Sequence, residues 1–217
     1  MAVKNEKYGR ILMAAIKVFA RQGFYQSTIS QVAREAGVAD GTIYLYFKNK
    51  DDILVHFFSF ISRKAFERFR QAVDSAESGE DKLRHLIRSH LSAFQQDMDF
   101  AIVYQVETHQ SSRLADEQIK EMSKMYRDII EEIVEQGQAE GSFRKDVYVG
   151  LVKRFVIGAV DEVINTWIHA GGTYDLVSMA EPLVDLFIQG IGHPEYVKTS
   201  GNGQAADIPY SSLQGEK

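Results

Sequence analysis

The sequence contains no cysteine and only three prolines among its 217 residues. The absence of cysteine excludes disulfide bonds and thiolate metal ligands, and it fits a reducing compartment such as the cytoplasm. Two of the prolines lie beyond residue 193, so proline scarcely interrupts the body of the chain, which favours an all-α fold. No apolar run reaches the 18 residues typical of a membrane-spanning helix, and no signal peptide is evident. We therefore expect a cytoplasmic protein without membrane contact.

The motifs of common enzymes and metal sites are missing as well. The six histidines include no pair spaced four residues apart and no His-Glu-x-x-His motif. There is no Walker loop, no Gly-x-Ser-x-Gly and no dinucleotide-binding fingerprint. The sequence therefore predicts no catalytic residue, no metal and no cofactor. A helical enzyme is the weakest of the alternatives, and measurable thioesterase turnover would revive it.

Positive charge is scarce overall but gathers at the N-terminal end. The chain carries a net charge of −5, yet residues 1–50 hold eight Lys or Arg against three acidic side chains, a net of +5. Residues 51–217 therefore carry −10. A basic head on an acidic body is attracted to phosphates at one end and repelled elsewhere, which suits a DNA-binding protein.

Residues 27–50 carry the most informative pattern. Apolar residues recur at helical spacing after Thr28, and Thr28 with Gln31 matches the capping-box spacing. Gly37 is placed to end this helix in a left-handed conformation. A second short helix then turns Ile43 and Phe47 inward and leaves outward Thr42, Tyr44, Tyr46, Lys48 and Lys50. This arrangement is typical of a helix-turn-helix whose second helix lies in the DNA major groove.

The rest of the chain predicts a helical body. A first amphipathic helix spans 6–22, and Asn49 is placed to cap a helix over about 50–74. Further helices are expected at 81–95, 98–109, 114–139, 146–170 and 175–191, with Gly137 and Gly141 bracketing one turn. We predict a DNA-binding domain at 4–64, an effector-binding and dimerisation domain at 65–192, and a disordered tail at 193–217.

The run 36–50, Ala-Gly-Val-Ala-Asp-Gly-Thr-Ile-Tyr-Leu-Tyr-Phe-Lys-Asn-Lys, resembles the TetR family of bacterial repressors. One departure is Ala39, where many relatives carry a capping serine, so Asp40 is the alternative cap. The resemblance implies DNA contacts from Thr28, Ala39, Gly41, Thr42, Tyr44, Tyr46, Lys48 and Lys50. The alternatives are a half-buried core position for each of the two tyrosines, and a solvated charge for Lys48.

Further segments are similar to the FadR branch of this family in bacilli, including 100–103, 113–114, 158–162 and 174–177. Members of that branch repress fatty-acid degradation genes and leave DNA when they bind long-chain acyl-coenzyme A. The resemblance implies an apolar tunnel with cations at its mouth, lined by Phe66, Phe69, Arg88, Phe94, Ile102, Tyr104, Arg113, Met122, Tyr126, Arg127, Ile130 and Phe155. A packed core is the alternative for each apolar member, and a solvated charge for each arginine.

Two other functions keep the same fold. A repressor that responds to a drug or another hydrophobic molecule needs a similar pocket, and acyl chain-length dependence would separate the two. A DNA-binding protein without a ligand would instead have a filled body.

The last two predicted helices carry wide apolar faces that suit a four-helix dimer interface. The residues predicted for it are Leu151, Phe155, Trp167, Leu183, Phe187 and Ile191. Packing of both helices within one subunit is the alternative. A homodimer would place two recognition helices on half-sites about 34–36 Å apart, so we expect a near-palindromic operator.

Overall fold

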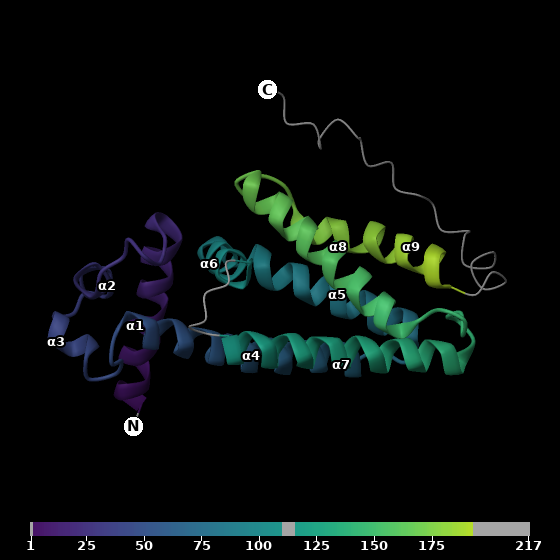
Figure 1. Cartoon of the computed structure of the whole chain (residues 1–217), viewed down its shortest axis with the longest axis horizontal. Helices are drawn as coiled ribbons and strands as arrows, with labels where there is room; N and C mark the ends of the chain where they lie inside the picture. Colours follow the sequence, from purple (N-terminus) through teal and green to yellow (C-terminus); the bar gives the residue numbers. More distant parts are fainter. Residues whose placement is uncertain (1, 110–115, 193–217) are drawn as a thin grey trace. The chain divides into compact units, whose positions relative to one another are not determined.

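The computed structural model describes residues 2–109 and 116–192, and within these ranges the fold is all-α, as predicted (Figure 1). Its elements are α1 (Ala2–Gln22), α2 (Ile29–Ala36), α3 (Asp40–Ile43), α4 (Lys50–Asp74), α5 (Gly79–Gln95), α6 (Met98–His109), α7 (Asp116–Glu140), α8 (Val149–His169), the 3-10 helix η1 (Leu176–Met179) and α9 (Ala180–Ile191). The described residues form no strand; one isolated bridge joins Phe143 and Gly192. No helix in these ranges is long and apolar enough to span a bilayer.

Local capping chemistry sets the ends of α2. The Thr28 side chain accepts from the backbone N–H of Gln31, and the Gln31 side chain accepts from the backbone N–H of Thr28 at 2.8 Å, which completes the predicted capping box. Gly37 ends the helix with a φ of 63°, a conformation that costs glycine little. Both predicted ends of this helix are confirmed.

The start of α3 differs from the prediction. Ala39 occupies the N-cap position without any side-chain hydrogen bond, and Asp40 is the first helical residue. The Asp40 carboxylate instead accepts a hydrogen bond from the Ser30 hydroxyl of α2. The alternative that Asp40 caps this helix is therefore wrong, because its side chain ties α3 to α2.

Helix α4 begins where its capping residue predicts. The Asn49 side chain accepts from the backbone N–H of Asp52 at 2.8 Å, and the Asp52 carboxylate accepts from the backbone N–H of Lys48 at 2.9 Å. These two bonds fix the junction between the turn after α3 and the first turn of α4. The helix then continues to Asp74, matching the predicted 50–74.

Two predictions about the later helices need correction. Gly137 lies inside α7 rather than at a turn, whereas Gly141 has a φ of 81° and does lie in the turn that follows. The segment predicted as one helix over 175–191 is divided into η1 and α9. The predicted tail at 193–217 lies outside the described residues.

The described chain forms two compact units. Unit 1 holds the residues up to Gln71 together with Ser92–Asp128, and unit 2 holds Ala72–Leu91 together with the residues from Ile129 onward. This division into compact units differs from the predicted DNA-binding domain at 4–64 and effector-binding and dimerisation domain at 65–192. Those two domains were assigned by function, and they remain a prediction.

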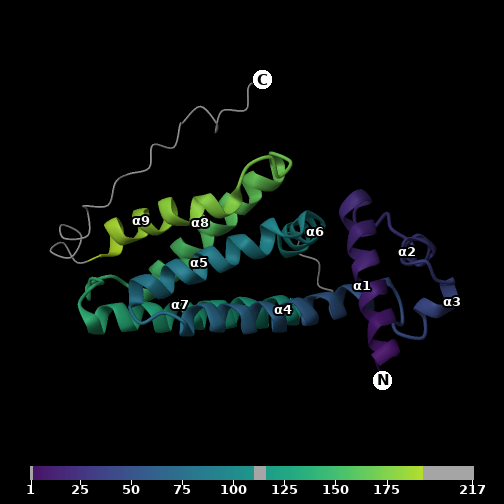
Figure 2. The ribbon, with the colours of Figure 1, turned by 180° about the vertical axis from the view of Figure 1, so that it is seen from behind.

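In unit 1, α1 packs against α2 and α6, and α2 packs against α3, so the three N-terminal helices lie together (Figure 2). The core of this group comes from the apolar face of α1, including Ile11, Leu12, Ala15 and Ile16, all at 0–1% exposure. Ile43 and Phe47 are buried, as predicted, and the Phe47 ring stacks on Tyr8 of α1. This core fixes α2 and α3 relative to each other.

In unit 2, α8 packs against α9 and η1 (Figure 1). The fully buried residues of α8 are Val156, Val160 and Ile164, which recur every four residues along one face. Trp167 extends this face, and its indole N–H donates to the Tyr174 carbonyl at 2.9 Å. The turn between α8 and η1 is thereby tied to the end of α8.

Candidate functional site

Exposed side chains of α2, α3 and the turn after α3 form the candidate DNA surface. Thr28 is exposed at the N-terminus of α2, where unpaired backbone amides and the helix dipole favour a phosphate. Ala39, the N-cap of α3, and Gly41 within the helix are exposed, and Thr42 is half-buried. A Cβ built on Gly41 would meet no atom within 4 Å, so the protein itself leaves this position open to close approach.

Tyr44 and Tyr46 differ in their surroundings. Tyr44 is 58% exposed, so its phenol is available to a ligand. Tyr46 is half-buried, and its ring centroid lies 6.5 Å from those of Tyr8 and Phe47. The half-buried alternative describes Tyr46 and does not describe Tyr44. Leu45, at 75% exposure, was not predicted; it is an apolar group suited to contact a thymine methyl.

Aromatic and polar contacts support the turn that carries Tyr46. The Tyr8 ring stacks on Phe47 at 5.2 Å, and its hydroxyl hydrogen-bonds the Nδ1 of His56 at 3.0 Å. The His56 ring meets Phe47 edge-on at 5.3 Å, and its Nε2 lies 3.7 Å from the Asp52 carboxylate. Burial raises the pKa of Tyr8. Tyr8 of α1 and His56 of α4 thus both pack against Phe47 and hold the turn in place.

The two lysines predicted to contact DNA differ in their exposure and in their hydrogen bonds. Lys48 is exposed, as a phosphate contact or a solvated charge would be. Lys50 is half-buried, and its amine donates to three backbone carbonyls, those of Phe24, Tyr25 and Ser27. This internal role was not predictable from a local pattern, because the acceptors lie 23 to 26 residues earlier in the chain.

Unit 1 also holds the aromatic cluster predicted to bind an effector. Phe94 is 3% exposed, and its ring centroid lies 5.1 Å from those of Phe100 and Tyr104. Tyr104 in turn lies 6.2 Å from Phe58. Farther along α4, Phe69 meets Tyr126 of α7 at 5.4 Å.

The remaining predicted ligand residues are divided between the two units. Met122 is buried in unit 1, where Phe66 and Ile102 are half-buried. Arg127 of that unit is exposed. Arg88, Ile130 and Phe155 belong to unit 2, where Ile130 is fully buried and Phe155 is 58% exposed. Arg113 lies outside the described residues.

Of the six residues predicted at the dimer interface, Leu151 and Phe155 are the exposed ones. Trp167, Leu183, Phe187 and Ile191 are buried at 2–8% exposure, so packing within the chain already accounts for them. Phe155 contacts Phe187 edge-on at 5.4 Å. Two exposed residues that were not predicted, Tyr148 at 71% and Leu186 at 64%, extend the apolar surface of α8 and α9.

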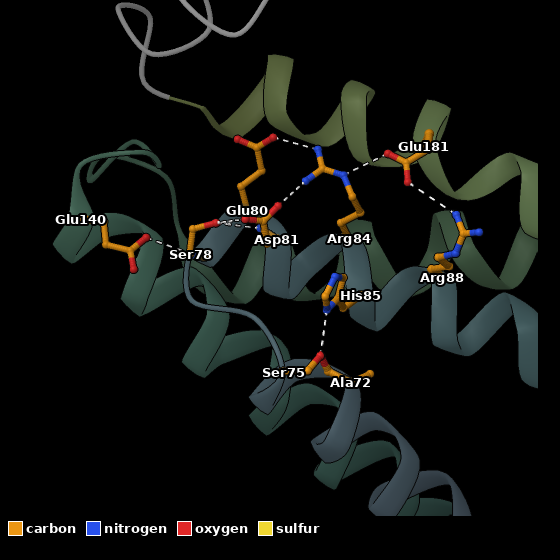
Figure 3. A network of polar contacts seen from close by, with 11 residues as sticks. Ala72, Ser75, Ser78, Glu80, Asp81, Arg84, His85, Arg88, Glu140 and Glu181 are labelled. Carbon is orange, nitrogen blue, oxygen red and sulfur yellow. Dashed lines mark hydrogen bonds and ion pairs between the residues drawn. The ribbon is translucent and has the colours of Figure 1, made fainter. Parts of the chain in front are cut away.

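An ion-pair network joins α5 to α9 (Figure 3). The Arg84 guanidinium donates to Glu181 at 2.9 Å, to Asp81 at 2.8 Å and to Glu80 at 2.9 Å. Burial lowers the pKa of Arg84, but hydrogen bonds and charge from Glu80 and Glu181 outweigh it and raise the pKa above its ordinary value. Arg88 lies 3.9 Å from the same Glu181 carboxylate. These arginines therefore have a structural use in unit 2.

Histidine is distributed without forming a metal site: among the described residues, no three His, Asp or Glu side chains group closely enough to hold an ion. His90 is buried inside unit 2, and burial lowers its pKa to about 4. Its imidazole is therefore neutral at neutral pH.

Two family models match the chain along most of its length. Residues 11–57 match the model of bacterial regulatory proteins of the TetR family, and residues 61–190 match the C-terminal region of YsiA-like proteins. The chain belongs to the TetR family. The resemblance first seen at residues 36–50 is confirmed, and the family match accounts for both the N-terminal helix-turn-helix and the helical body.

Known TetR-family relatives are similar over nearly their whole length. The Fatty acid metabolism regulator protein of Bacillus subtilis (strain 168) is 37% identical over 88% of this chain and 98% of that protein. The structure of the fatty acid degradation regulator FadR from Bacillus halodurans superposes with a TM-score of 0.80 at 34% identity, covering 85% of this chain and 95% of that one. FadR from Bacillus subtilis, in complex with stearoyl-CoA, gives a TM-score of 0.78 at 36% identity, covering 85% and 99%.

Proposed function

We propose that this TetR-family protein represses fatty-acid degradation genes as a homodimer in the cytoplasm, and that long-chain acyl-CoA releases it from its operator. It acts by binding, without catalysis and without a cofactor. The observation that carries the proposal is the 37% identity with a fatty acid metabolism regulator over 98% of that protein's length.

Two observations support a long-chain acyl-CoA as the effector: the ligand of a related protein and the apolar side chains of this one. A FadR structure that is 36% identical to this chain is a complex with stearoyl-CoA. In this chain, the buried rings of Phe94 and Phe100 and the half-buried ring of Tyr104 form an aromatic cluster in unit 1. Such a cluster offers apolar surface to an acyl chain, at about 0.8 kcal/mol for each buried methylene group. The predicted cations for the coenzyme A phosphates remain Arg88, Arg113 and Arg127.

The proposed DNA-binding mode uses three exposed residues and the half-buried Thr42. Thr28 and Lys48 meet phosphates, which positions the head, while Thr42 and Tyr44 reach base edges in the major groove. Neither Arg nor Asn lies on α3 to make a bidentate base contact, so thymine methyl contacts and DNA shape carry more of the specificity. A dimer engages two half-sites, and the operator is a near-palindrome.

Release requires that acyl-CoA bind the two conformations of the protein with different affinity. A tenfold loss of operator affinity corresponds to about 1.4 kcal/mol of coupling, which is within the usual range for allosteric proteins.

Fluorescence anisotropy on labelled duplexes from upstream of fatty-acid degradation genes tests the proposal. The complex is titrated at stated salt with acyl-CoA of increasing chain length, with free coenzyme A as the control. We expect tight binding and release by long chains alone. Tight binding that no acyl-CoA reverses would reject this effector and favour a repressor that responds to another hydrophobic molecule.

The aromatic cluster has its own test. Phe94→Leu keeps the site apolar but removes a ring, so release should need about tenfold more acyl-CoA while operator affinity stays unchanged. The matched control is Phe143→Leu, a buried phenylalanine that follows α7 and lies outside the cluster. Unchanged acyl-CoA sensitivity in Phe94→Leu would remove Phe94 from the effector site.

A further inference from the structure

The Lys50 amine is fully engaged inside the protein. It donates to the carbonyl of Phe24 at 2.7 Å, to that of Tyr25 at 3.1 Å and to that of Ser27 at 2.9 Å. An ammonium group has three N–H donors, so each has an acceptor. The amine also lies 4.5 Å from the centroid of the Phe24 ring, in a cation–π contact. A phosphate would have to compete with these four interactions.

Lys50 thereby fixes the turn between α1 and α2. Three carbonyls of the six-residue turn between α1 and α2 converge on one cation, and two other hydrogen bonds complete the arrangement. The Ser27 hydroxyl donates to the Gly23 carbonyl at 2.7 Å, and the Gln22 amide donates to the Ser27 hydroxyl at 3.2 Å. Phe24 is 4% exposed, so its side chain anchors the turn in the core. The backbone that leads into Thr28 is therefore set before DNA arrives.

One aromatic side chain of this turn is largely exposed to solvent. Tyr25 is 69% exposed, although its ring is held edge-on against Phe24 at 5.5 Å with an interplanar angle of 78°. Its carbonyl is one of the three that Lys50 holds. The phenol is thus presented by a fixed backbone, three residues before the predicted phosphate contact at Thr28. Tyrosine hydroxyls are common donors to DNA phosphates.

We propose that Tyr25 is a further contact to the DNA backbone and that Lys50 is the positioning residue that presents it. This inference rests on the proposed DNA-binding function. It gives the two lysines near the start of α4 different tasks: Lys48 binds DNA through its charge, and Lys50 acts through the turn that it holds.

The salt dependence of DNA affinity separates these tasks. Each phosphate neutralised by a lysine contributes about 0.9 to the slope of log K against log salt on duplex DNA. We expect Lys50→Met to weaken binding about tenfold without changing the slope, and Lys48→Met, the matched control, to lower the slope by about 0.9. A drop of that size for Lys50→Met would make Lys50 a phosphate contact and overturn the inference.

A charge-preserving variant covers the case in which Lys50→Met fails to fold. In Lys50→Arg the planar guanidinium keeps the charge but does not match three carbonyls that converge on a point. We expect it to lose affinity about tenfold, with circular dichroism and thermal melting used to confirm folding. Wild-type affinity in Lys50→Arg would mean that charge alone matters at this position, against a positioning role.

A double-mutant cycle tests whether Lys50 acts through Tyr25. Tyr25→Phe removes only the hydroxyl and should weaken DNA binding about threefold to tenfold in the wild-type background. In the Lys50→Arg background the same change should cost nothing, because the phenol is no longer presented. No effect in the wild type would reject the Tyr25 contact, and an equal effect in both backgrounds would reject the positioning role.

The outcomes also separate this inference from the proposed function. Absence of any DNA binding by the wild-type protein would overturn both. If the Tyr25 and Lys50 variants show the expected losses of DNA affinity but acyl-CoA fails to release DNA, this inference stands and only the effector is rejected.

Discussion

At the scale of single residues, burial determines the charge of His90. The side chain is 8% exposed, and removal from water disfavours the imidazolium, so its pKa is lowered to about 4. In the unfolded chain a histidine binds its proton near pH 6.5. The folded protein therefore binds fewer protons than the unfolded chain throughout the interval between pH 6.5 and 4.

This difference predicts a loss of stability in mild acid. Because the folded pKa is depressed, the contribution of His90 is complete above pH 6.5 and is lost as the pH falls toward 4, by about 3 kcal/mol in total. Urea unfolding at pH 7 and pH 5 should show about 2 kcal/mol of this loss. His90→Gln does not titrate and should show a correspondingly smaller drop; an undiminished drop would assign the effect to other groups.

Lys50 shows what sequence reasoning misses at this scale. Lys48 and Lys50 look equivalent in the sequence, since both follow the recognition segment and both are positive. They differ because a turn more than twenty residues earlier packs against one of them. The capping pair Thr28 and Gln31 was predictable, because both partners lie within one helical turn.

At the scale of elements, a close helix crossing in unit 2 depends on glycine. A Cβ on Gly137 of α7 would lie 2.2 Å from the Phe143 ring, and one on Gly79 would lie 2.8 Å from the backbone of Gly137. Phe143 is 1% exposed, so it has little room to move. The N-terminal end of α5 and the chain after α7 therefore reach their positions only because two side chains are absent.

Gly137→Ala should accordingly destabilise the protein. Overpacking of this kind costs about 1–3 kcal/mol, which outweighs the better helix propensity of alanine. Gly9→Ala is the matched control: Gly9 is a helical glycine of α1 with nothing within 4 Å of a built Cβ, and this change should stabilise by up to about 1 kcal/mol. Denaturant midpoints compare the two, and an equal gain in both variants would contradict the crossing argument.

The same crossing explains why the turn predicted at Gly137 was wrong, although the helix predicted over 114–139 is close to the observed α7. Helices α4 and α6 have the predicted bounds, 50–74 and 98–109, because apolar periodicity and flanking caps define them locally. Gly137 suggested a turn because glycine is a poor helix former. Its actual reason, the approach of Phe143 and Gly79, is a tertiary contact that a local pattern does not contain.

At the scale of the whole molecule, dimerisation remains a prediction, and the exposed side chains now define the surface that would form the interface. Leu151 and Leu186 are apolar and 59–64% exposed on α8 and α9. Leu151→Glu combined with Leu186→Glu should convert the dimer to monomers in sedimentation velocity at micromolar concentration, because four charges would be buried in one interface. Operator affinity should fall with it, since both half-sites are needed.

The matched control for this prediction is Met13→Glu, which places a charge on an apolar residue of α1 that is 42% exposed. It should leave the sedimenting mass unchanged. A double variant that still sediments as a dimer would locate the interface away from α8 and α9. The family and its helical architecture were predictable from sequence, whereas the exposed members of this surface were not, because periodicity does not distinguish a face covered within the chain from a free one.

Trp167 is a fluorescent probe at a single known position in the molecule. It is the one tryptophan in a chain with ten tyrosines and no cysteine. Its indole is 3% exposed, with its N–H on the Tyr174 carbonyl, so its emission reports the environment at the end of α8. Excitation at the red edge of the tryptophan absorption band avoids the tyrosines, so the emission reports on unit 2 alone. Because the chain has no cysteine, a cysteine engineered into unit 1 can carry a thiol-reactive dye that reports on that unit in the same sample. Tryptophan emission and dye emission can therefore be recorded separately, one from each unit.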